Sequence, residues 1–136
     1  MDRDEEHLKL LSIFHYVAGG MAGLFACFPI IHLIIGIIML TGGFEEASGD
    51  EEFPVLLFGL MFTLIPGLIM LCGWALAICL IVAGRKLAKR TNYMFCLVIA
   101  CIGCIFMPFG TVLGVFTIIV LMRPSVKELF AANKTL

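Results

Sequence analysis

Three long apolar runs constrain the fold of this chain more than any other feature. They cover residues 13–40, 53–84 and 93–122, and each exceeds the ~20 residues that a membrane-spanning helix needs. Hydrophobic residues make up 62% of the 136 residues, charged residues only 14%, and the mean hydropathy is +1.12. Because so little polar surface cannot cover a soluble domain, the sequence predicts an all-α integral membrane protein. We expect one transmembrane helical domain over residues 1–136.

Basic residues indicate the side of the membrane on which each connection lies. Arg3 and Lys9 lie near the N-terminus, four basic residues lie in the connector 84–92, and three lie in the tail 123–134. The loop 41–52 carries five acidic residues and no Lys or Arg. Since short cytoplasmic loops are enriched in Lys and Arg, we predict that the N-terminus and the connector are cytoplasmic and that the loop is external.

The third apolar run contains a turn signal at its middle. Pro108, Gly110 and Thr111 are typical of a turn that opens a new helix. A hairpin here places every Lys and Arg on the cytoplasmic side, although each half, at about 22 Å, is short for a ~30 Å hydrocarbon core. We therefore predict a helical bundle with both termini cytoplasmic. Its four membrane helices are expected at 10–41, 53–84, 92–106 and 109–122.

The alternative is a bundle of three membrane helices, in which 93–122 is one kinked span and the C-terminus lies outside. Pro29 and Pro66 lie inside the first two runs. We expect both runs to remain single helices, kinked or not, because neighbouring helices in a membrane can satisfy the carbonyl that a proline frees.

Both ends of the chain, 1–12 and 124–136, are predicted to be interfacial cytoplasmic helices. In the tail, Ser125 and Glu128 have the spacing of a helix capping box. The apolar residues at helical spacing in the two ends are Leu8, Leu11 and Phe14, and Val126, Leu129 and Phe130. We expect the tail residues of this set to lie on the membrane.

Small residues recur four positions apart, as in helices that pack closely in lipid. Gly19 and Gly23 form one G-x-x-x-G pair, and Gly110 and Gly114 form another. These helix-packing residues serve either packing within one chain or self-association of the protein.

His32 lies about nine residues before the outer end of the first predicted helix, ~13 Å deep in the membrane. An ionisable residue at that depth is a candidate for function, so we predict a ligand-binding site formed by His32, Thr63 and Thr111. The alternative is a neutral histidine whose ring bonds to a carbonyl or hydroxyl group, with no ligand.

Catalytic and metal-binding patterns are missing from the sequence. All ten Asp and Glu lie outside the apolar runs, so no carboxylate is available for proton coupling or acid–base catalysis in the membrane. Cys101, Cys104 and Met107 share a helix face, but no second pair completes a soft-metal site. We predict no enzyme activity, no cofactor, no metal and no nucleic-acid partner.

The tail PFGTVLGVFTIIVLMRPSVKELF resembles the C-terminal segment of an uncharacterised family of small bacterial multi-pass inner-membrane proteins with a P-x-G-T-x-L-G element. FHYVAGGMAGLFACFPIIHLIIG is similar to the N-terminal half of the same group. The residues that carry the tail resemblance are Pro108, Gly110, Thr111, Leu113, Gly114, Leu121, Pro124, Val126 and Phe130. The resemblance implies a location in the bacterial inner membrane, and it implies no activity and no site residues.

Two functions follow as expectations. The first is a non-enzymatic multi-pass membrane protein that packs with itself or joins a larger membrane complex, with membrane lipids and a homo-oligomer or partner membrane protein around it. The alternative is a binder or carrier of a lipid, small molecule or ion that uses an intramembrane cavity near His32.

Overall fold

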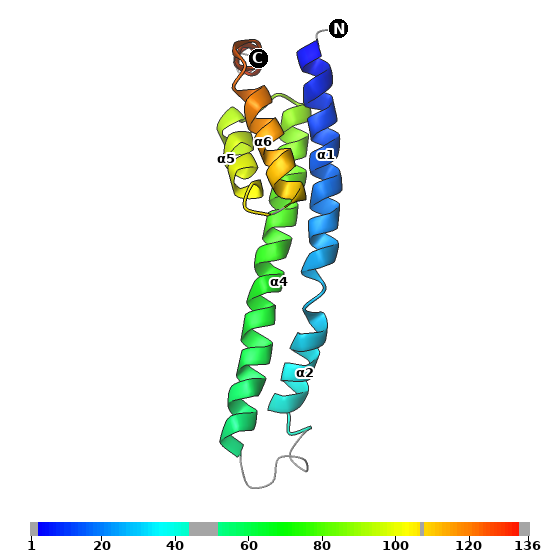
Figure 1. Ribbon diagram of the computed structural model, residues 1–136, viewed down its shortest axis with the longest axis vertical. Helices are drawn as coiled ribbons and strands as arrows, with labels where there is room; N and C mark the ends of the chain where they lie inside the picture. Colours follow the sequence, from blue (N-terminus) through cyan, green and yellow to red (C-terminus); the bar gives the residue numbers. More distant parts are fainter. Residues whose placement is uncertain (1–2, 44–51, 107, 134–136) are drawn as a thin grey trace. The chain divides into compact units, whose positions relative to one another are not determined.

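The computed structural model describes residues 3–43, 52–106 and 108–133, and every regular element in these ranges is a helix. The predicted all-helical architecture is therefore confirmed for this part of the chain. The helices are α1 (Arg3–Ala26), α2 (Ile30–Leu40), α4 (Glu52–Ala88), α5 (Tyr93–Gly103), α6 (Phe109–Leu121) and α7 (Pro124–Ala132) (Figure 1).

Two helical stretches in the described ranges are long and apolar enough to cross a membrane. They are Arg3–Leu40, which comprises α1 and α2, and Val55–Ala88 within α4. Helices α6 and α7 pass the same test together but meet at 76°, and α5 is apolar with only 11 residues. Length and composition thus support two such helices, or three if α6 and α7 form one bent span.

The prolines of the first two apolar runs differ in their effect on the helix. At Pro29 the first run is divided into α1 and α2, and the turn between them is closed by the Ile30 N–H, which donates to the Cys27 carbonyl over 3.1 Å. Pro66 lies inside α4, which continues through it. Because proline lacks an N–H, each position loses one helical hydrogen bond. Helix α1 ends at Ala26, three residues before Pro29, which is the N-cap residue of α2, whereas α4 continues through Pro66.

The chain divides into two compact units, and the first comprises Met1–Met21 and Leu76–Leu136. Buried side chains from α1, α4, α5, α6 and α7 meet in its core. The core residues are Leu8, Leu11, Leu87, Cys96, Val120, Leu121, Val126 and Phe130. Figure 1 shows α5 and α6 next to each other in this unit.

Helices α5 and α6 pack antiparallel. The Tyr93 hydroxyl at the start of α5 donates to the Leu121 carbonyl at the end of α6 over 3.1 Å, while the other ends of the helices meet at Gly103 and Gly110. The Thr111 hydroxyl donates to the Cys104 carbonyl over 2.7 Å and so satisfies a main-chain oxygen in the turn. In the structure the chain therefore reverses direction between α5 and α6.

The apolar face of α7 packs on the protein. Val126 and Phe130 are 0% and 6% exposed and belong to the core of the first unit. The expectation that they lie on the membrane is wrong, because the 76° bend after α6 turns this face toward the core. The predicted capping box is also not formed: Arg123 occupies the N-cap position without a side-chain cap, and Ser125 bonds elsewhere.

The apolar face at the N-terminal end of α1 is only partly buried. Leu8 and Leu11 are buried in the same core, whereas Phe14 is 51% exposed. Helical spacing places the three side chains on one broad face, and only part of that face is covered by the rest of the unit.

The second unit comprises Ala22–Ala75. Its helices approach each other at small residues. A Cβ atom added to Gly36 would lie 2.5 Å from the Thr63 Oγ1, and one added to Gly73 would lie 2.7 Å from the Ala26 Cβ. Such distances are too short for real Cβ atoms, so glycine is what allows these helices to pack this closely.

Candidate functional site

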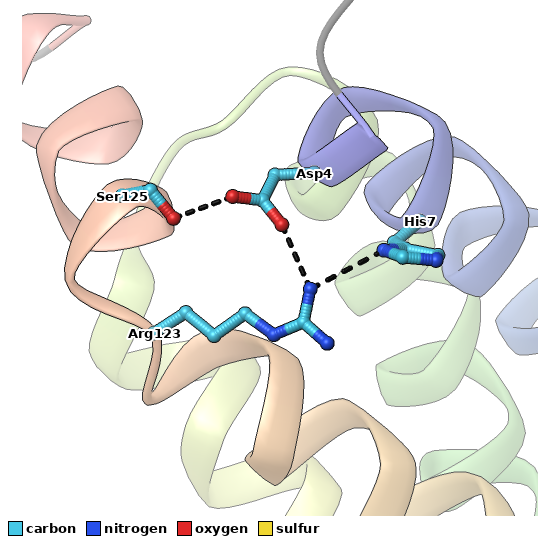
Figure 2. Close-up of polar contacts among 4 residues, drawn as sticks. All are labelled: Asp4, His7, Arg123 and Ser125. Atoms are coloured by element: carbon cyan, nitrogen blue, oxygen red, sulfur yellow. Dashed lines mark hydrogen bonds and ion pairs between the residues drawn. The ribbon is translucent and has the colours of Figure 1, made fainter.

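The terminal polar cluster consists of Asp4, His7, Arg123 and Ser125, and it joins the first turns of α1 to the start of α7 (Figure 2). The Asp4 carboxylate accepts a hydrogen bond from the Arg123 Nη1 over 2.8 Å and another from the Ser125 hydroxyl over 2.5 Å. Asp4 also suits the first turn of α1, where the helix dipole favours a negative charge.

Electrostatics and hydrogen bonding both favour the ionised form of Asp4. The Ser125 hydroxyl, and then the Arg123 guanidinium, hold the pKa of the Asp4 carboxyl below its usual value of 3.8. The same Arg123 Nη1 lies 3.4 Å from the His7 Nδ1.

Two further contacts connect the basic connector to both ends of the chain. The Arg90 Nη2 lies 2.9 Å from the Glu5 Oε1, with both side chains about one-third exposed. The Asn133 Nδ2 donates to the Lys89 carbonyl over 2.5 Å. Together with the terminal polar cluster, these contacts bring α1, the connector and α7 together at one end of the first unit.

A buried polar layer lies next to this end. The Ser12 hydroxyl donates to the Gly84 carbonyl over 2.7 Å, and the His15 Nδ1 donates to the Leu11 carbonyl over 2.9 Å. His15 is 1% exposed, and Gly84 packs against its Cβ. The depth of a histidine along the first run pointed to His32, but the histidine enclosed by protein is His15.

His32 lies on α2 with its side chain exposed, and its ring stacks on Phe62 with the centroids 5.9 Å apart. Thr63 is the residue after Phe62, and its hydroxyl donates to the Gly59 carbonyl over 2.8 Å. Thr111 belongs to the other unit and bonds to the turn before α6. Both threonine hydroxyls thus have main-chain partners within their own helix or turn.

The glycines predicted to pack helices lie in different surroundings. A Cβ added to Gly19 would lie 2.7 Å from the Ile81 Cγ1, and one added to Gly114 would lie 2.5 Å from both the Ala100 oxygen and the Cys104 Sγ. Gly110 packs against the Gly103 carbonyl, and Gly23 is half-buried in α1. For Gly19, Gly110 and Gly114 the close neighbour belongs to the same chain.

Two surface hollows lie at the charged end of the first unit, of about 620 Å³ and 350 Å³. The larger lies between the residues after α4, the start of α5, and α7, and the smaller is lined by residues of the connector and α7. His32, Thr63 and Thr111 line neither of them.

The arrangement is suited to holding helices together. The carboxylate of Asp4 is engaged by a cation and a hydroxyl, and within the described ranges no three His, Cys, Asp or Glu side chains gather as metal ligands. The terminal polar cluster was not predicted from the sequence. A signal for it was present, because the N-terminal segment is acidic, the tail is basic, and both were assigned to the same side of the membrane.

No family model, no curated protein and no solved structure matches this chain.

Proposed function

We propose that the protein is a non-enzymatic multi-pass membrane protein that associates with itself, or with a larger membrane complex, through the uncovered faces of its long helices. One observation supports this most directly: in an apolar segment of 18 residues within each long helical stretch, only 11% of the residues are buried by the chain itself. Helices in lipid associate by close packing of side chains, and such long uncovered faces leave room for protein neighbours.

The outer α1 face, formed by Leu10, Ile13, Val17 and Gly20, is our candidate for this contact. These residues recur at spacings of three and four, and the first three are 52%, 52% and 55% exposed. A Cβ added to Gly20 would meet nothing within 4 Å. An apolar face with a small residue near one end allows a second copy of α1 to approach closely, and a two-fold dimer would bury the same face of both copies.

We also propose that the protein lies in the bacterial inner membrane with both termini cytoplasmic. The distribution of Lys and Arg supports this orientation. The bonds from Arg123 and Ser125 to Asp4 support it further, since segments in contact outside the apolar runs lie on the same side of a membrane.

Sedimentation equilibrium in density-matched mild detergent tests the association. We expect the native chain to form a dimer or a larger oligomer, and Gly20→Leu to shift the protein toward monomer because leucine keeps the two α1 helices apart. Ala75→Leu introduces the same side chain at an exposed position of α4 and is the matched control, expected to leave the distribution unchanged. A native chain that sediments as a monomer and purifies without any partner subunit would refute the proposal.

A further inference from the structure

The larger hollow, which we term the interfacial groove, has a mixed chemical character. Its volume is about 620 Å³, within the range of small-molecule sites. Three parts of the chain form it: residues 90–92 after α4, the first turn of α5, and α7. Its charged and large apolar lining residues include Arg90, Tyr93, Met94, Phe95, Lys127 and Phe130.

The charged part of the interfacial groove is positive. Arg90 and Lys127 both line it, and none of the described residues that line it is acidic. Lys86 adds a third cation beside it, with its Nζ 5.4 Å from the centroid of the Phe95 ring. Glu5 is the acidic partner of Arg90, and the exposed Lys127 comes from a helix more than thirty residues away in sequence. The fold therefore gathers cations from distant segments around one hollow.

The other part of the interfacial groove is apolar and aromatic. The Tyr93 ring meets the Phe130 ring edge-on, with centroids 5.7 Å apart and an interplanar angle of 80°. Met94 is 66% exposed and continues onto the surface of the apolar helix α5. The groove thus lies at the point where the chain passes from a charged connector into an apolar segment, which is the level of lipid headgroups in a membrane.

Arg90, one of the cations that line the interfacial groove, has an unusual backbone conformation. Arg90 and Asn92 have φ angles of 53° and 51°, in the left-handed region that favours glycine. The Thr91 N–H donates to the Lys86 carbonyl over 2.9 Å and closes the end of α4. Glycine would adopt the conformation of residue 90 more easily, but it would bring no charge to the groove.

We propose that the interfacial groove binds an anionic phospholipid. The headgroup phosphate lies between Arg90 and Lys127, and the acyl chains run along Met94 and α5. Cations near the membrane surface attract anionic headgroups, and an apolar surface that continues from them accepts the chains of the same molecule. A soluble phosphate would make no use of the apolar part, so the lipid is the better match. This inference does not depend on the oligomeric state.

Native mass spectrometry of the full chain in mild detergent tests the site, with phosphatidylglycerol and phosphatidylcholine as the added lipids. We expect phosphatidylglycerol to bind in preference to phosphatidylcholine. Lys127→Gln should weaken phosphatidylglycerol binding about fivefold, the effect typical of one interfacial cation. Lys127→Arg should restore it. Arg85→Gln removes an exposed cation of the same connector that does not line the groove, and this matched control should bind as the native chain does.

Three results would overturn the proposal. The first is equal binding of the anionic and the zwitterionic lipid. The second is equal loss of binding in Lys127→Gln and Arg85→Gln, which would indicate a diffuse charge effect. The third is displacement of the lipid by inorganic phosphate, which would indicate a site for soluble anions. Lys127 is exposed, so its replacement leaves the core intact, and an unchanged helical signal in circular dichroism checks this.

Discussion

Replacement of Gly114 by alanine is the sharpest test of the packing between α5 and α6. The added Cβ would lie 2.5 Å from the Ala100 carbonyl oxygen and 2.5 Å from the Cys104 Sγ. The first of these atoms belongs to the backbone of α5, which can yield only if the helices separate. Overpacking of this kind typically lowers the free energy of unfolding by ~1–3 kcal/mol. Alanine also favours the helix by up to ~1 kcal/mol, so the net loss is smaller than the clash alone.

Gly103→Ala in the same hairpin is the matched control. A Cβ there would lie 3.8 Å from the Gly110 oxygen, which is an ordinary contact. Gly103 is the last residue of α5, so alanine gains less helix preference there than at Gly114 inside α6. The difference between the two free energies of unfolding is therefore a lower bound on the packing term, which we expect to be about 1–3 kcal/mol. Reversible unfolding in mixed micelles, followed by circular dichroism, measures it. Equal stability of the two variants would refute the close approach of α5 and α6 at Gly114.

Two further predictions concern the ends of the chain. Topology reporters fused to the N-terminus and after residue 136 should both report the cytoplasm, and a periplasmic signal from the second would indicate a single kinked span over 93–122. Because the pKa of Asp4 is lowered in the folded state, its contacts stabilise the fold above about pH 3.8 and are lost as the pH falls through the folded value. The thermal unfolding temperature of Asp4→Asn should therefore fall less on acidification than that of the native chain or of the control Glu6→Gln. Parallel curves of unfolding temperature against pH for the three proteins would contradict this.

The helices themselves could be predicted from the sequence because hydropathy and charge act locally. The predicted segments 53–84 and 109–122 correspond to α4 (Glu52–Ala88) and α6 (Phe109–Leu121). Pro108, Gly110 and Thr111 indicated the reversal for reasons that the structure makes specific: the Thr111 hydroxyl bonds to the Cys104 carbonyl, and Gly110 permits contact with Gly103. These are properties of neighbouring residues, so the sequence carries them directly.

The burial of individual side chains could not be predicted in the same way. Helical spacing showed that Val126 and Phe130 share an apolar face, but the same spacing suits contact with lipid and contact with protein. The 76° bend between α6 and α7 decides between them, and no local pattern specifies that angle. Depth along an apolar run favoured His32 over His15 for a similar reason: hydropathy measures position along the chain, whereas burial depends on neighbours such as Gly84.

The terminal polar cluster shows a third kind of limit. Asp4 and Arg123 are separated by 119 positions, and their ion pair depends on the return of the chain through α5 and α6. The acidic N-terminal segment and the basic tail were assigned to the same side of the membrane, which is consistent with an ion pair between them. The two segments contain several charged residues, however, and these could pair in many ways. Only the packed position of α7 selects Asp4, Arg123 and Ser125.

The lengths of α5 and α6 bear on how this region meets a membrane. Helix α5 has 11 residues and α6 has 13, which corresponds to about 16 Å and 20 Å, well short of a ~30 Å hydrocarbon core. The two helices run antiparallel, and the Tyr93 hydroxyl at the start of α5 donates to the Leu121 carbonyl at the end of α6. We therefore expect this hairpin to enter a bilayer and leave it through the same face. Its turn would then lie within the apolar layer, where each unpaired carbonyl is unfavourable, and the bond from Thr111 to Cys104 satisfies one of them.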